Sequence, residues 1–164
     1  MIARLSLSHL IAASIGILAI LFAVGWATRQ DPAETPYLKI LGGGFMFNYR
    51  EGDVYYGFSA AVMRPLPTGS IIEASFEDPS GGEPLVVRKR VGTDTERYSL
   101  RSPEVRGVKA GKPYHVAIRI FDREEQSLLG TQGLDFTSKI NDDMVPDKPL
   151  VVGPGYTPNP EADG

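Results

Sequence analysis

Histidine and cysteine usage limits the chemistry available to this chain. The 164 residues contain two histidines, His9 and His115, and no cysteine. His9 lies beside an apolar run and His115 lies in an alternating strand pattern, so the two cannot act as a pair. No serine stands in a Gly-x-Ser-x-Gly nucleophile motif, and disulfides, thiolate metal sites and cysteine nucleophiles are excluded. We therefore expect no enzymatic activity, no metal and no cofactor.

Carboxylates form the second group with chemical potential. They cluster at Glu77-Asp78, at Asp122 with Glu124-Glu125, and at Asp142-Asp143, each in a predicted turn. The alternating spacing of a calcium-binding EF-hand loop is absent, which favours solvated turn charges over a calcium site. A carboxylate pair that acts on a sugar must face across a cleft, so a carboxylate-dependent hydrolase is the least favoured alternative.

The main basic cluster is Arg88-Lys89-Arg90, with Arg97, Arg101 and Arg106 nearby in sequence. Strand alternation would place Arg88 and Arg90 on one face with Val86, where charges typically protect an edge strand from pairing with other chains. Contact with anionic headgroups or with an acidic protein surface is the functional alternative. Together with one tyrosine and a late apolar segment, these cations are the predicted partner-binding residues: Arg88, Lys89, Arg90, Tyr55, Leu150, Val151 and Val152.

An apolar run near the N-terminus predicts a membrane segment. Residues 10–27 carry no ionisable side chain, and about 18 helical residues cover roughly 27 Å, close to the thickness of a hydrocarbon core. This predicts a transmembrane helix over residues 9–28 after a cytoplasmic segment, residues 1–8. The helix would be a retained signal anchor; a signal peptide cleaved after Gly25-Trp26-Ala27 is the alternative.

The charges that flank this run predict its orientation. Arg4 precedes it, whereas Arg29 is followed by Asp31 and Glu34. By the positive-inside rule, the C-terminal part lies outside. We therefore expect a single-pass protein of a bacterial inner membrane with its domain in the periplasm.

The rest of the chain predicts a β-rich domain between a linker and a tail. After a linker over residues 29–36, period-two alternation separated by Gly, Pro and Asp turns predicts about seven strands within residues 37–140, the last of them over residues 134–140. This pattern favours an all-β antiparallel sandwich. The Gly42-Gly43-Gly44 triplet is interpreted as a bulge or bend in a strand. Residues 141–164, rich in Pro and Gly, are predicted to be a flexible tail.

One segment points to a more specific fold. Val108 to Ile120 places a Gly-containing turn before Tyr114 and alternating aliphatic residues. It resembles the corner and following strand of immunoglobulin-like domains, in particular those of fibronectin type III. The resemblance implies an immunoglobulin-like sandwich in which the hydroxyl of Tyr114 is buried and bonded to the backbone near Val108.

These patterns favour a function without catalysis. The leading hypothesis is a membrane-anchored accessory, assembly or scaffold protein of the cell envelope that acts through contacts with another protein. The alternative is a periplasmic ligand- or glycan-binding module with a pocket lined by Tyr55, Tyr56 or Tyr98. The net charge of -3 and ordinary charged fraction of 23% argue against a nucleic-acid partner.

Overall fold

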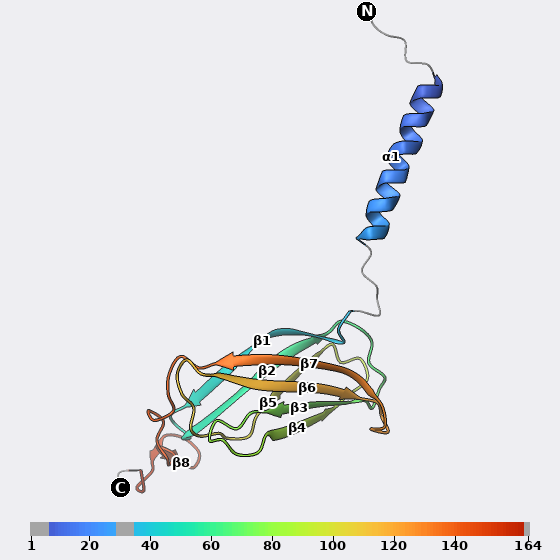
Figure 1. Cartoon of the computed structure of the whole chain (residues 1–164). Coiled ribbons are helices and arrows are strands. Elements are labelled where there is room, and N and C mark those ends of the chain that lie inside the picture. Colours follow the sequence, from blue (N-terminus) through green and yellow to red (C-terminus); the bar gives the residue numbers. More distant parts are fainter. Residues whose placement is uncertain (1–6, 29–34, 163–164) are drawn as a thin grey trace, which may run out of the picture. The chain divides into compact units, whose positions relative to one another are not determined.

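The computed structural model describes residues 7–28 and 35–162 of the chain (Figure 1). The chain divides into two compact units, residues 1–35 and residues 36–164. The first contains one helix, α1, over Leu7–Ala27. Residues 1–6 of the predicted cytoplasmic segment and 29–34 of the predicted linker lie outside the described residues.

The prediction of a transmembrane helix requires correction. A helix forms where the uncharged run predicted it, but no helix among residues 7–28 and 35–162 is long and apolar enough to cross a membrane. The prediction rested on the Leu, Ile, Phe and Val residues, which make up half of residues 10–27. The other half consists of Ala, Gly, Ser and Trp, which contribute less to insertion than Leu, Ile, Phe or Val. The single-pass anchor therefore has no support from the structure.

The second unit contains a three-stranded antiparallel sheet with the strand order β1-β2-β5. β1 spans Leu38–Asn48, β2 spans Asp53–Val62 and β5 spans Arg97–Arg101. The register of β1 on β2 shifts between Ile40 and Gly42, so the predicted irregularity at the glycine triplet is confirmed. Along β2, buried and partly exposed residues alternate, as expected for a strand with one face in a core.

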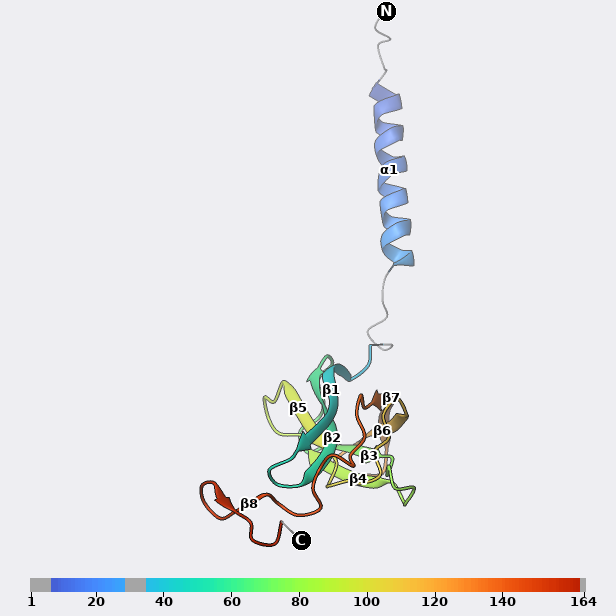
Figure 2. The same ribbon diagram turned by 90° about the vertical axis from the view of Figure 1, so that its left-hand side faces the viewer.

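A second antiparallel sheet has four strands in the order β4-β3-β6-β7, and Figure 2 shows the two sheets on opposite sides of the domain. Its strands are β3 (Ile71–Phe76), β4 (Leu85–Arg90), β6 (Pro113–Phe121) and β7 (Leu128–Thr137). The last of these begins and ends earlier than predicted. Gly130 and Gly133 interrupt its apolar alternation, whereas pairing of Phe121 with Leu128 brings the strand back directly along β6.

The inner faces of both sheets contribute to one hydrophobic core. Tyr56 of β2 stacks on Phe45 of β1, with 4.6 Å between ring centroids, and meets Phe76 of β3 edge-on at 5.2 Å. Tyr56 and Phe76 are fully buried. The mainly β, antiparallel architecture is therefore confirmed, and its two sheets around a shared core are consistent with a β-sandwich.

The predicted environment of Tyr114 is also confirmed. The side chain is fully buried. Its hydroxyl accepts a hydrogen bond from the backbone N–H of Lys109 at 2.8 Å and donates a longer one to the carbonyl of Gly107 at 3.4 Å. The ring thus closes the loop that leads into β6.

The segment after residue 140 contacts this domain. Val145 is buried in the core, and the carboxylate of Asp142 accepts a hydrogen bond from the N–H of Gly107 at 2.6 Å. A short hairpin follows, in which β8 (Val151–Val152) pairs with β9 (Thr157–Pro158). These contacts were not predictable from the sequence pattern, because one buried valine does not produce a periodic pattern.

Arg106 is expected to hold that segment in place. Its guanidinium donates hydrogen bonds to the carbonyls of Gly52, Val145 and Pro146, which joins the β1–β2 turn to residues 145–146. Arg106→Gln should expose the segment after residue 140 to protease, because charge-assisted hydrogen bonds of this kind stabilise by about 1.5–3 kcal/mol. Limited proteolysis with mass mapping checks this. Arg97→Gln, on an exposed strand face, should leave the cleavage rate unchanged.

Candidate functional site

The outer face of the β1-β2-β5 sheet carries a groove. Cross-strand register places Gly42, Ser59 and Ser99 in one row and Gly44, Gly57 and Arg101 in the next. A third pair, Met46 and Tyr55, continues the face toward the β1–β2 turn. Because directly paired residues point to the same side of an antiparallel sheet, these side chains all face outward.

Small residues form the floor of the groove. A Cβ atom added at Gly42 or Gly44 would meet no atom within 4 Å, so the missing side chains leave open space above the backbone. The resulting hollow has a volume of about 650 Å³. Over this stretch a ligand could approach the sheet backbone more closely than on an ordinary strand surface.

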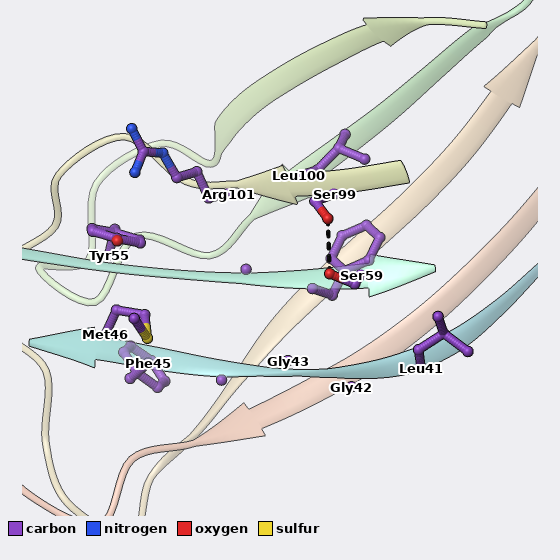
Figure 3. A pocket seen from close by; sticks show the side chains of 13 residues that line it. Leu41, Gly42, Gly43, Phe45, Met46, Tyr55, Ser59, Ser99, Leu100 and Arg101 are labelled. Atoms are coloured by element: carbon purple, nitrogen blue, oxygen red, sulfur yellow. Dashed lines mark hydrogen bonds between the residues drawn. The ribbon is translucent and has the colours of Figure 1, made fainter. Parts of the chain in front are cut away.

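Larger side chains surround the floor (Figure 3). Leu41 and Met46 are 51% and 56% exposed, so two apolar side chains on this face are accessible to a partner. The guanidinium carbon of Arg101 lies 4.8 Å from the centre of the Tyr55 ring, a cation–π arrangement. Together the groove offers apolar contacts, the cation of Arg101 and the partly exposed ring of Tyr55.

Two hydroxyls cross the middle of the groove. Ser59 of β2 and Ser99 of β5 lie with their Oγ atoms 2.8 Å apart and share one hydrogen bond (Figure 3). A serine hydroxyl supplies one donor and two acceptor positions, so the pair keeps one proton and further lone pairs for a ligand. The groove therefore has polar as well as apolar capacity.

The structure separates the predicted partner-binding residues. Tyr55 lines the groove. Arg88, Lys89 and Arg90 lie on β4, at the edge of the other sheet. Leu150 precedes the short hairpin, and Val151 and Val152 form its first strand. These residues do not form one surface.

Arg88 has a structural partner of its own. Its guanidinium lies 2.6 Å from the carboxylate of Glu73, which is 2% exposed, and 2.9 Å from that of Glu125. Arg119 contacts the same Glu73 carboxylate from β6. A carboxylate removed from water in this way requires such partners. Arg88 is thus engaged within its own sheet, as part of a cross-strand ion-pair network.

The carboxylate clusters are engaged in turns. A hydrogen bond from the backbone N–H of His115 lowers the pKa of Glu77 and outweighs the opposing effect of burial, and contacts from Lys112 lower the pKa further. Hydrogen bonds from the hydroxyl and N–H of Ser80 lower the pKa of Asp78. Both groups are thus held ionised, the opposite of what a general acid needs. Across the described ranges, no group of three or more His, Cys, Asp or Glu residues is arranged to hold a metal.

Sequence reasoning missed most of the groove. The outward-facing lining residues that it did not name as partner-binding are Leu41, Gly42, Gly44, Met46, Gly57, Ser59, Ser99 and Arg101. The available signal was the glycine triplet together with a further glycine at an outward position of the next strand. These glycines indicate a groove only when the strand register is known, because the register pairs Gly44 with Gly57.

Comparison with known proteins does not assign this chain to a family. No protein-family model matches it, and no curated protein matches it.

Proposed function

We propose that the second unit is an immunoglobulin-like domain of the fibronectin type III kind. Its support is the division into sheets β1-β2-β5 and β4-β3-β6-β7, with the chain crossing between them after β2, β4 and β5. The second support is Tyr114 near the start of β6, whose hydroxyl bonds the backbone upstream as in a tyrosine corner. Many domains of this architecture serve as binding modules, but fold alone assigns no activity.

From its surface we infer a binding function without catalysis. The chain acts as an accessory or assembly protein, and the groove on the β1-β2-β5 sheet is its contact surface for another protein. The observation that carries this proposal is the exposure of Leu41 at one end of the groove and of Met46, beside Tyr55 and Arg101, at the other, above a floor without side chains. Aromatic residues, Met and Arg are the types enriched at the centres of protein interfaces.

The ligand- or glycan-binding alternative has less support. Of the three tyrosines expected to line such a pocket, Tyr56 and Tyr98 are 0% and 4% exposed and belong to the core. Tyr55 alone of the three lines the groove. Small-molecule sites typically bury most of the ligand surface, which a groove open along its length does not do.

Quantitative co-purification tests the protein-binding proposal. The tagged full chain is recovered under mild conditions from cells that naturally produce it, beside Gly42→Leu, which fills the groove, and Thr131→Leu, which adds the same side chain to the outer face of β7. We expect Gly42→Leu to reduce the recovered partner about tenfold, equivalent to about 1.4 kcal/mol. Equal recovery with wild type and both variants would contradict the proposal.

A further inference from the structure

We propose that the groove binds an extended, acidic segment of the partner protein, about five residues long, that lies along β1. This inference rests on the proposed function and specifies the chemistry of its partner.

The two apolar side chains at the ends of the groove define its length. Leu41 and Met46 are five positions apart on β1 and both are exposed. At about 3.3–3.4 Å per residue this spans about 17 Å, the length of about five extended residues. A segment of that length with an apolar side chain near each end would cover both. Met suits such a contact because its side chain adapts to different shapes.

The floor of the groove favours the binding of an extended peptide backbone over the binding of a bulkier ligand. Gly42 and Gly44 present backbone without side chains, with open space above each. An extended chain can therefore lie close to the sheet, where its N–H and C=O groups reach the Ser59–Ser99 hydroxyl pair in the middle of the groove. Buried backbone groups need such partners, so the serines make this approach favourable.

The charge of the groove favours an acidic segment. The cation that lines it is Arg101, which has no carboxylate within ion-pair distance in the described part of the chain. Lys39 and Arg97 add positive charge on the same face, in register with Ala61 of β2. Glu51, Asp53 and Glu104 line a neighbouring hollow together with Arg101. Glu51 accepts a hydrogen bond from the side chain of Asn48 at 2.8 Å, and Glu104 pairs with Arg106 at 3.3 Å. The guanidinium of Arg101 is thus available to a carboxylate of the partner, which it can bind with two hydrogen bonds.

Tyr55 fixes where that carboxylate binds. The stacking of Arg101 on its ring holds the guanidinium at the Met46 end of the groove (Figure 3). The expected segment therefore has an Asp or Glu at this end in addition to the apolar residues that cover Leu41 and Met46. A planar guanidinium that is already positioned loses less freedom on binding than a free side chain.

An array of peptides tests this inference directly. The full chain is applied to seven-residue peptides with blocked ends, arranged in matched pairs that differ by Asp or Glu against Asn or Gln. We expect the bound peptides to combine one acidic and at least one apolar residue, and their amide partners to bind about tenfold more weakly. Arg101→Gln should abolish this preference. Arg97→Gln, a matched arginine on the same strand and face outside the groove, should retain it.

Different results would contradict the acidic-segment inference and the protein-binding function. Equal binding of acidic and amide peptides, or an unchanged preference in Arg101→Gln, overturns the acidic-segment inference. An array of acidic glycans is probed in parallel, and binding there without peptide binding overturns it as well. If Gly42→Leu still loses the natural partner in those cases, the protein-binding function stands and only the assigned chemistry fails. If Gly42→Leu keeps the partner, the function itself fails.

Discussion

Gly43→Ala is expected to destabilise the β-domain by about 1–3 kcal/mol, the usual cost of forcing extra volume into a packed site. Unlike its neighbours in the triplet, Gly43 faces the core. A Cβ atom there would contact the carbonyl oxygen of Gly57 and lie 2.6 Å from Cζ of Phe136. One of these neighbours is backbone, which cannot move aside without disturbing the pairing of β1 and β2. Chemical denaturation of the full chain, followed by the β-type circular dichroism signal, measures the effect.

Gly42→Ala provides the matched control for this result. The adjacent glycine faces the groove, where an added Cβ meets nothing within 4 Å. We expect its free energy of unfolding to stay within about 1 kcal/mol of the wild type, because Ala in place of Gly also restricts the unfolded chain. Equal destabilisation by both substitutions would mean that the two glycines do not face opposite sides of β1.

Tyr114→Phe is the second substitution expected to have a large effect. The ring would remain in the core. The N–H of Lys109 would lose the hydroxyl that accepts its hydrogen bond at 2.8 Å, and the carbonyl of Gly107 would lose the longer hydrogen bond that the hydroxyl donates. A buried backbone group without a partner costs about 1–3 kcal/mol. The midpoint of urea denaturation should therefore fall, with an unchanged m-value if the unfolded state is unaffected.

Tyr55→Phe tests whether that loss is specific. Tyr55 lies on the outer face beside Arg101, and Phe keeps the aromatic ring for the cation–π contact. We expect a shift in stability within about 0.5 kcal/mol, as is usual for surface substitutions. Small and equal shifts for Tyr55→Phe and Tyr114→Phe would contradict the corner role of Tyr114 and weaken the immunoglobulin-like assignment.

Alternation in the sequence predicted most of the β-domain. Val54, Tyr56 and Phe58 recur at every second position of β2, and all three are buried. The pattern is informative because β2 has one face in the core and the other partly exposed. The environment of Tyr114 was predictable for a similar reason, since the corner depends on a short local stretch before β6.

The groove could not be predicted from local patterns. It depends on register between three strands, because Gly44 and Gly57 form a floor only when they are paired across β1 and β2. Glycine carries no apolar signal, so Gly42 and Gly44 interrupt the alternation of β1 and resemble a bulge or bend. Arg101 was likewise indistinguishable from other exposed cations until pairing with Gly57 placed it above the floor.

Site-specific photo-crosslinking tests the central claim, that the outer face of the β1-β2-β5 sheet is the contact surface. A photoreactive amino acid is placed at Ser59, in the middle of the groove, and in a second variant at Thr131, on the outer face of the opposite sheet. Irradiation of cells that naturally produce the protein should give a discrete adduct from position 59, lost in Gly42→Leu, and none from position 131. An adduct from position 131 alone, or one from position 59 that persists in Gly42→Leu, would contradict the claim.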